Sequence, residues 1–335
     1  MDQTQAGELR LPGARIFTRP RAGLYIAVIV LAALGAAYHR AKTVSIFGCG
    51  ADGYSADRYL SYCNAGWYGD FDSGAFWYSL EPEAIRAAGA AQLLFVGNSS
   101  MQFGYSNDVA RSWLTQNAAS YYLLGFSYGN VIIFRELLPR IGAHPKAYVI
   151  NLDGFFEEDV SAITLNALEE PDAIWHFRGK QFWQFVHRAV CQPLAGLCGH
   201  SFSWFRSRHT GAWYPAGDLS LSVPKPASID AAVDPTMVAH DAALARRFVA
   251  RLGVDQRCVI FTLVPMVDAP IATSRAIAEA IGLDFIAPQL DKMNTFDGVH
   301  LDRVSAERWS AAFFAAAGQR LRECLAEPPD GRRVH

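Results

Sequence analysis

The sequence predicts a mixed α/β fold with a parallel sheet at its centre. From residue 91 onward, short uninterrupted apolar runs alternate with segments of helical periodicity, which is typical of strands buried on both faces of a parallel sheet. One uncharged apolar segment precedes this region near the N-terminus. The 335 residues are 51% hydrophobic, which is enough for one large domain with an insertion. These observations predict a doubly wound, flavodoxin-like sheet preceded by an N-terminal transmembrane helix and interrupted by an aromatic-rich insertion.

The apolar segment from Ala22 to Tyr38 carries no charge and is long enough to span a bilayer. Arginines dominate the flank before it, which favours a cytoplasmic N-terminus. We therefore expect a cytoplasmic tail over residues 1–21, a single-pass anchor in the inner (plasma) membrane over residues 22–39, and a periplasmic position for the rest. Small residues late in the segment leave open its cleavage as a signal peptide, which would produce a secreted protein.

Six cysteines also favour an exported location, because an even number of cysteines outside the cytosol usually pairs. Buried free thiols are the alternative. The spacing does not match that of a structural zinc site, so we expect no metal. The two short loops that disulfides would close are Cys49–Cys63 and Cys191–Cys198, which leaves Cys258 and Cys324.

The charge pattern excludes some classes of partner. The formal net charge is −2, and the Lys and Arg residues are scattered, so the chain lacks the basic stripe of a nucleic-acid-binding protein. Gly48, Gly50 and Gly53 precede no change from strand to helix, which indicates a loop and not a phosphate-binding turn. We expect neither nucleic acid nor a cofactor.

After the anchor, the sequence predicts the remaining elements in order. Within the lead-in over residues 40–90, the stretch from Phe47 to Ser79 has no clear period, so we expect a loop there. Pro82 suits the first turn of a helix over about residues 82–90. The main domain is expected over residues 91–325, with a C-terminal tail over residues 326–335. The expected strands are Leu93–Val96, Tyr121–Leu124, Ala147–Leu152, Cys258–Val264 and Leu283–Ile286, and the clearest helices are Val131–Ile141 and Val304–Leu325.

The alternation breaks down in an insertion over residues 155–235. Because it lies between two predicted strands, we expect it over the carboxyl edge of the sheet, where open α/β folds bind ligands. One interpretation is a lid or a wall that contacts carbohydrate. The other is a packing subdomain or a surface that rests on the membrane. Its four tryptophans are Trp175, Trp183, Trp204 and Trp213.

Two short motifs supply candidate chemistry. Ser99 directly follows the first strand of the main domain, where a turn can expose its hydroxyl at the carboxyl edge. Asp297 and His300 lie on a turn before the last helix, at a spacing that brings the carboxylate beside the imidazole. A serine hydroxyl is a poor nucleophile until a base accepts its proton and a third group orients that base. Ser99, His300 and Asp297 are therefore the candidate catalytic residues.

The order of these motifs resembles that of the SGNH (GDSL-type) hydrolase family, over roughly residues 91–325. Gly97-Asn98-Ser99-Ser100 resembles the first block of the family, with Asn98 in the place of the usual Asp. Asp297-Gly298-Val299-His300-Leu301 resembles the fifth block and is intact.

The resemblance also implies an oxyanion hole. Its donors would be the backbone N–H groups of Ser99 and of Gly125 or Gly129. The third block of the family normally adds an asparagine from a Gly-x-Asn-Asp setting. The equivalent stretch here runs from Ile150 to Gly154, which departs from that pattern and leaves Asn151 as the candidate.

The resemblance is nearest to the membrane-anchored, exported branch of the family, which is associated with acylation of bacterial cell-surface polysaccharides. It implies a serine esterase or O-acetyltransferase that acts on exported or cell-surface polysaccharide, with polysaccharide synthesis or export proteins as candidate partners. The alternative hypothesis is a catalytically inactive SGNH-like module that binds glycan or scaffolds such a complex. A third hypothesis is an unrelated α/β protein with a coincidental match.

Overall fold

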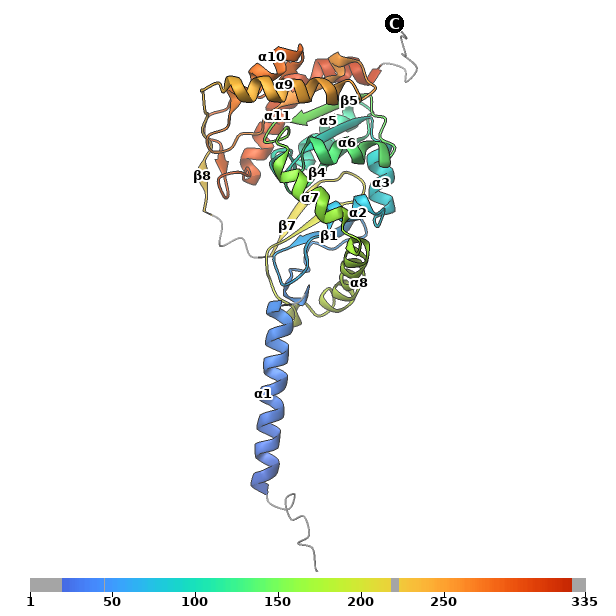
Figure 1. The fold of residues 1–335 in the computed structure, drawn as a ribbon. Coiled ribbons are helices and arrows are strands. Elements are labelled where there is room, and N and C mark those ends of the chain that lie inside the picture. The colour runs from blue at the N-terminus through green and yellow to red at the C-terminus, as the bar shows by residue number, and fades with distance from the viewer. Residues whose placement is uncertain (1–19, 45, 218–222, 327–335) are drawn as a thin grey trace, which may run out of the picture.

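The computed structural model describes residues 20–44, 46–217 and 223–326. Its first element is helix α1 (Pro20–Val44), which projects away from the rest of the molecule (Figure 1). The window Ala22–Ala41 within α1 is long and apolar enough to cross a membrane, and none of it is buried against the protein. The tails expected at the two ends of the chain lie almost entirely outside the described residues.

A five-stranded parallel sheet forms the centre of the main domain, as the sequence predicted. Its strands lie in the order β10-β9-β5-β3-β4, and each neighbouring pair is parallel. Strand β3 is the first of these strands along the chain, and it lies between β4, the second, and β5, the third. The strands are β3 (Leu93–Gly97), β4 (Tyr121–Gly125), β5 (Ala147–Asn151), β9 (Val259–Thr262) and β10 (Asp284–Phe285).

Both faces of this sheet are buried. Leu94 and Val96 of β3 belong to one apolar cluster, and Leu93 and Phe95 belong to another. Successive side chains of a strand point to opposite faces, so each face has its own apolar cover. The helices of the main domain are α3 (Pro82–Gly89), α4 (Ser99–Gly104), α5 (Asn107–Gln116), α6 (Val131–Arg140), α9 (Pro235–Val249), α10 (Ile271–Ile281) and α11 (Arg303–Ala326).

A second, antiparallel sheet corrects the expectation that the lead-in is a loop. Strand β1 of the lead-in pairs with β6 of the insertion, so the two segments form one unit. The mostly buried pattern of β1 explains why no alternation marked it as a strand. In Figure 1 this unit lies between the main domain and α1. The sheet has the order β2 (Gly69–Asp70), β1 (Arg58–Cys63), β6 (Ser203–Ser207) and β7 (Trp213–Ala216).

Short elements complete the chain. A two-stranded pairing of β8 with β11 precedes the turn that carries His300. Of the other helices, α8 is the longest and runs beside the antiparallel sheet. These elements are η2 (Ile46–Gly48), α2 (Asp72–Trp77), α7 (Asp159–Glu169), α8 (Ala173–Cys191), η3 (Ala195–Leu197), β8 (Lys225–Pro226), η4 (Gln256–Cys258) and β11 (Asn294–Thr295).

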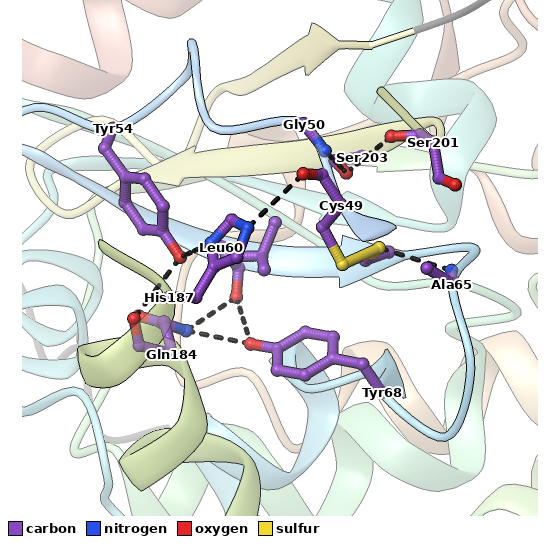
Figure 2. The surroundings of a disulfide bond; sticks show 11 residues. Cys49, Gly50, Tyr54, Leu60, Ala65, Tyr68, Gln184, His187, Ser201 and Ser203 are labelled. Carbon is purple, nitrogen blue, oxygen red and sulfur yellow. Dashed lines mark hydrogen bonds between the residues drawn. A yellow bond between two sulfur atoms is a disulfide. The ribbon is translucent and has the colours of Figure 1, made fainter. Parts of the chain in front are cut away.

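All six cysteines form disulfides, and the expected pairing is confirmed. The bridge between Cys49 and Cys63 joins the segment after η2 to the end of β1 (Figure 2). The others join the end of α8 to the segment after η3 and the start of β9 to α11. With one apolar N-terminal helix, three disulfides are consistent with an extracytoplasmic protein.

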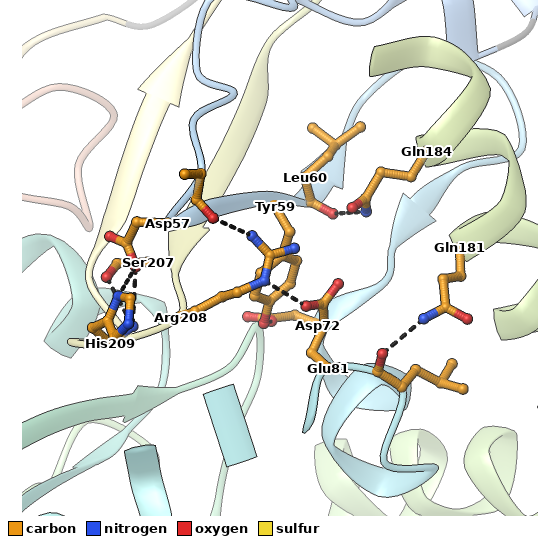
Figure 3. Close-up of polar contacts among 12 residues, drawn as sticks. Asp57, Tyr59, Leu60, Asp72, Glu81, Gln181, Gln184, Ser207, Arg208 and His209 are labelled. Atoms are coloured by element: carbon orange, nitrogen blue, oxygen red, sulfur yellow. Dashed lines mark hydrogen bonds and ion pairs between the residues drawn. The ribbon is translucent and has the colours of Figure 1, made fainter. Parts of the chain in front are cut away.

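Polar contacts fasten the antiparallel unit to the main domain (Figure 3). Arg208, just after β6, pairs with Glu81 at the start of α3 at 2.9 Å, and both side chains are mostly buried. Gln181 of α8 donates to the carbonyl of Leu80 at 2.7 Å. The insertion is thus held against the helix that leads into β3.

The disulfides should differ in how much they stabilise the protein. Replacing Cys258 and Cys324, which are 66 positions apart, with alanine should lower the free energy of unfolding by about 4 kcal/mol, because the bridge restricts a long loop in the unfolded chain. Replacing Cys191 and Cys198, which are 7 apart, should cost about 2 kcal/mol. Denaturant unfolding of the two double variants measures both losses, and equal losses would contradict the argument from loop length.

Candidate active site

The turn after β3 places Ser99 at the carboxyl edge of the parallel sheet. Asn98 caps helix α4, and its side-chain oxygen accepts from the backbone N–H of Ser100 at 3.0 Å. The same oxygen accepts from the hydroxyl of Ser100 at 2.7 Å. Ser99 is therefore the first residue of α4, on a backbone that two hydrogen bonds from Asn98 hold in place.

A chain of buried hydrogen bonds extends from this turn across the sheet. The side-chain amide of Asn151, at the end of β5, donates to the hydroxyl of Ser100 at 2.9 Å. The side-chain oxygen of Asn151 accepts from the backbone N–H of Val264, beyond β9, at 2.9 Å. Ser100 and Asn151 are both fully buried, so water does not compete for these bonds. The chain ties the ends of three strands to the turn that carries Ser99.

Asn98 also contacts Asp153, which follows β5. Its amide nitrogen donates to the backbone carbonyl of Asp153 at 2.8 Å and to the carboxylate at 3.0 Å. An aspartate at position 98 would have no N–H to donate and would place a second carboxylate against Asp153. The side-chain amide of Asn98 is therefore complementary to Asp153, because it supplies the N–H donor that the carboxylate accepts.

Asp297 and His300 lie on one tight turn. The N–H of Phe296 donates to the carbonyl of His300 at 2.9 Å, and Gly298 has a φ of +102°, which favours glycine. One carboxylate oxygen of Asp297 accepts from the backbone N–H groups of Val299 at 3.0 Å and His300 at 2.9 Å. These backbone hydrogen bonds orient the carboxylate of Asp297 independently of its contact with the imidazole.

The structure brings the three predicted residues together. The Nε2 atom of His300 lies 2.9 Å from the hydroxyl oxygen of Ser99, and its Nδ1 atom lies 2.6 Å from the second carboxylate oxygen of Asp297. With its proton on Nδ1, the imidazole donates to Asp297, and Nε2 is free to accept a proton from Ser99. This arrangement can activate a serine for attack on a carbonyl carbon.

The environment of Asp297 keeps it ionised. Burial favours the neutral acid, but the hydrogen bond and charge of His300, together with two backbone N–H groups, outweigh it and lower the pKa of Asp297 to about 2. The carboxylate therefore stays charged wherever an imidazole titrates. Because its pKa is lower in the folded state, Asp297 stabilises the fold at every pH above the ordinary pKa of an aspartate. This stabilisation is lost as the pH falls through about 2.

Aromatic rings surround the imidazole. The ring centroid of His300 lies 5.0 Å from Phe103 of α4, 5.4 Å from Phe296 and 6.2 Å from Trp204 of β6. Trp204 in turn packs at 4.5 Å from Trp213 of β7. The insertion thus supplies part of an apolar wall beside the site, and the side chain of His300 is only 13% exposed.

Two glycines lie against the serine turn. A Cβ atom at Gly125 would lie 2.7 Å from the carbonyl of Asn98, and one at Gly129 would lie 2.8 Å from the carbonyl of Gly97. Neither position has room for a side chain. The N–H of Gly129 already donates to the carbonyl of Phe126 at 3.0 Å. Gly129 would have to give up this bond to donate to an oxyanion, so Gly125 is the glycine that we keep as the candidate donor.

Asn151 is the last residue of β5 and is fully buried beneath the turn. Its side-chain oxygen accepts from the N–H of Val264, and one N–H of its amide donates to Ser100. These bonds support the backbone of the site. Because a side-chain amide has two N–H groups, Asn151 stays a candidate oxyanion donor beside Ser99 and Gly125.

A buried ion pair beneath Gly125 was not predicted. Arg206 of β6 pairs with Asp72 of α2 at 3.1 Å, with both side chains almost fully buried, and it also donates to the carbonyl of Gly125. Tyr59 and Trp213 donate to the same carboxylate at 2.5 Å and 3.2 Å. No local signal identified this pair, because its members come from two segments that the sequence did not connect.

Other clusters in the described residues offer no competing site. His187, Cys191 and Cys198 lie close enough to hold a metal ion, but the two cysteines are joined in a disulfide and have no thiolate to offer. A surface groove of about 730 Å³ lies between α5 and α11, away from the serine turn, and includes Trp113 and Arg322. Within the described residues, Ser99, His300 and Asp297 are therefore the candidate active site.

Comparisons with known proteins do not add to this assignment. No family model, curated protein or solved structure matches the chain.

The pairing of Asn98 with Asp153 predicts a specific coupling. Asn98→Asp should lower the free energy of unfolding at neutral pH, because two carboxylates would then lie about 3 Å apart. Adding Asp153→Asn should restore stability, with a coupling of about 1 kcal/mol or more. Denaturant unfolding of the two single variants and the double variant measures this coupling. The loss in Asn98→Asp should shrink below about pH 4, where carboxylates are protonated, and purely additive effects would exclude the proposed match.

The ion pair of Asp72 and Arg206 predicts a pH-dependent loss. Arg206→Met should cost about 3–5 kcal/mol, because it leaves a buried carboxylate unpaired. Burial already raises the pKa of Asp72 to about 6 against the opposing effects of Arg206, Tyr59 and Trp213. Removal of the arginine raises this pKa further, so the folded state binds a proton that the unfolded state releases, and the loss should grow as the pH rises.

The measurement is denaturant unfolding of Arg206→Met at about pH 5 and at about pH 8. A matched control is Arg206→Met combined with Asp72→Asn, which removes the unpaired charge and should recover much of the stability. A loss that is the same at both pH values would show that Asp72 is not the source of the cost.

Proposed function

We propose that this protein is a serine-dependent acyl-group enzyme of the SGNH type. The observation that carries the proposal is the continuous contact from Ser99 through His300 to Asp297, at 2.9 Å and 2.6 Å. Two further observations support it. The serine lies on a turn held by buried hydrogen bonds, and the strand order has the 2-1-3-4-5 pattern of a doubly wound, flavodoxin-like sheet, whose ligands bind at this edge.

The proposed reaction has two steps. The hydroxyl oxygen of Ser99 attacks the ester carbonyl while Nε2 of His300 accepts the hydroxyl proton, and Asp297 stabilises the imidazolium that forms. The backbone N–H groups of Ser99 and Gly125 stabilise the negative charge on the carbonyl oxygen. His300 then gives its proton to the departing alcohol, which leaves an acyl-serine.

In the second step, water or a sugar hydroxyl attacks the acyl-serine. His300 accepts the proton of the attacking group as the new bond to the acyl carbon forms. It then returns the proton to the oxygen of Ser99 as the bond between Ser99 and the acyl carbon breaks. With water the reaction is ester hydrolysis, and with a sugar hydroxyl it is acyl transfer. The aromatic wall of Phe103, Phe296 and Trp204 limits access of water to the imidazole and so supports transfer.

We propose that the enzyme acts on acetyl or other acyl groups of exported or cell-surface polysaccharide, outside the cytoplasm. The apolar helix α1 supports a single-pass anchor in the inner membrane, and the disulfides support an oxidising compartment. Aromatic side chains beside the site suit the apolar faces of sugar rings. Polysaccharide synthesis or export proteins at the same membrane are its proposed partners.

Activity on a chromogenic acetyl ester tests the proposal. Ser99→Ala and His300→Ala should each lower turnover about 10³-fold or more, because the nucleophile and its base act as one unit. The matched controls are Ser112→Ala on α5 and His209→Ala, both on exposed side chains outside the site, and both should keep the activity of the parent. A fluorophosphonate probe should label the parent protein and should not label Ser99→Ala.

Turnover that is unchanged in both Ser99→Ala and His300→Ala would overturn the proposal. Glycan binding that survives Ser99→Ala in a protein that neither turns over ester nor reacts with the probe would instead assign the chain to an inactive, glycan-binding module. The departure of the stretch Ile150 to Gly154 from the third block of the family is the observation that favours this second candidate.

A further inference from the structure

Helix α8 has its polar and apolar faces reversed with respect to the protein core. Its buried residues include Lys180, Gln184 and His187, which are 5%, 7% and 0% exposed. Its exposed residues include Trp175, Phe182 and Phe185, which are 64%, 61% and 70% exposed. A helix on the surface of a soluble domain normally turns its apolar stripe inward. In α8, Phe177 is buried in this way, whereas Trp175, Phe182 and Phe185 point outward.

Hydrogen bonds hold the buried polar residues of α8 against the antiparallel unit. Lys180 donates to the carbonyl of Asp70 at 2.6 Å, and Gln184 donates to the carbonyl of Leu60 at 2.9 Å. His187 lies between the hydroxyl of Tyr54 and the carbonyl of Cys49 (Figure 2). Because a carbonyl can only accept, Nε2 of His187 carries the proton and Nδ1 accepts from Tyr54.

Burial also changes the pKa values of two of these residues. It lowers the pKa of Lys180 to about 8, against the effect of Asp70, and the pKa of His187 to about 4, against its bond to Cys49. Each buried polar group of the face has a partner in the antiparallel unit, so α8 cannot turn its rings inward without leaving these groups unpaired. The outward direction of the rings is therefore a fixed property of the fold.

The outward rings lie on one stripe. Trp175, Phe182 and Phe185 are spaced at seven and three residues, which places them on the same side of a helix. Arg178 lies on the stripe between them and covers the ring of Trp175 at 4.9 Å. Beyond α8, Leu194 and Leu197 are 53% and 49% exposed. We define the aromatic face by Phe182, Trp183, Phe185, Leu194 and Leu197, which come from the second half of α8 and the segment after it.

The aromatic face lies beside the end of α1. Helix α1 ends at Val44, and η2 begins at Ile46. Phe47 of η2 contacts the ring of Trp183 with centroids 6.1 Å apart, and its carbonyl accepts from Gly199 at 2.7 Å. Figure 1 shows the lower end of α8 next to the point where α1 enters the domain. A bilayer that α1 spans therefore has its surface at the level of this face.

The charged residues of α8 and the segment after it also fit a position at the surface of a bilayer. Residues 173–217 contain no Asp or Glu, whereas Arg178 and Arg188 lie on α8. The acidic residues Glu169, Glu170 and Asp172 come before α8, and in Figure 1 this end of α8 is the one away from α1. Tryptophan and phenylalanine beside basic residues, with no carboxylate, match the interfacial region of a bilayer with anionic headgroups.

We propose that the aromatic face lies in the interfacial region of the bilayer that α1 spans. The inference rests on the proposed membrane anchor and is independent of the proposed chemistry. In this position the domain is held by α1 and by a second contact, so that it does not swing freely about the short connection after Val44. The orientation of the serine turn toward the space outside the membrane is then constrained.

The test uses the full chain reconstituted in vesicles of phosphatidylcholine and phosphatidylglycerol. All six native cysteines are paired, so a single introduced cysteine can carry a fluorescent probe. The probe positions are Phe182→Cys and Phe185→Cys on the aromatic face, Leu31→Cys in α1, and Val304→Cys on α11. Val304 is the matched control because it is 65% exposed, which is similar to Phe182. Each variant is measured with and without brominated phosphatidylcholine, which quenches probes within the bilayer.

Loss of fluorescence at Leu31, Phe182 and Phe185, with none at Val304, is the expected result. Quenching at Leu31 alone would overturn the inference and leave the anchor intact. Absence of quenching at Leu31 would overturn the anchor and the inference together. The probe on Phe185→Cys can also be tested with iodide, a quencher in the aqueous phase. Protection of this probe from iodide in native membranes, but not in the vesicles, would overturn the inference and would assign the aromatic face to a contact with another protein. The activity of Ser99 enters none of these outcomes.

Discussion

The buried ion pair of Asp72 and Arg206 connects the two sheets of this protein and sets the position of the site between them. Asp72 belongs to α2, directly after the antiparallel strands of the lead-in, and Arg206 belongs to β6 of the insertion. Arg206 also donates to the carbonyl of Gly125 at the end of β4. Charges that are fully removed from water are tolerated only with partners at close range, so the three segments are held in one arrangement.

The candidate site depends on that arrangement. Ser99 and Gly125 come from the parallel sheet, whereas Trp204, which contacts the ring of His300, comes from the same strand as Arg206. Alternate residues of a strand point to the same side, so Arg206 and Trp204 reach the carboxyl edge of the parallel sheet together. The insertion is thus a structural part of the site, and its aromatic wall provides the dry surroundings in which the proposed acyl transfer would compete with hydrolysis.

Some elements could be predicted and others could not. The five parallel strands were identified within two residues at each end, because an apolar run buried on both faces is visible in the local sequence. The contact of Asp297 with His300 was also local, since both lie on one turn. By contrast, β1 was taken for a loop. This error concerns a long-range partner, because β1 pairs with β6 of the insertion.

Short-range pattern was therefore sufficient for the apolar helix and for the order of the strands and helices of the parallel sheet. The candidate triad also needed the order of its motifs along the chain and the resemblance to a family. Folding in three dimensions was needed to join the lead-in to the insertion, to pair Asp72 with Arg206, to match Asn98 with Asp153 and to turn the rings of α8 outward. The physical reason is the range of the interaction. Periodicity and turns depend on neighbours along the chain, whereas buried charges and amides depend on partners that only the folded chain brings into contact.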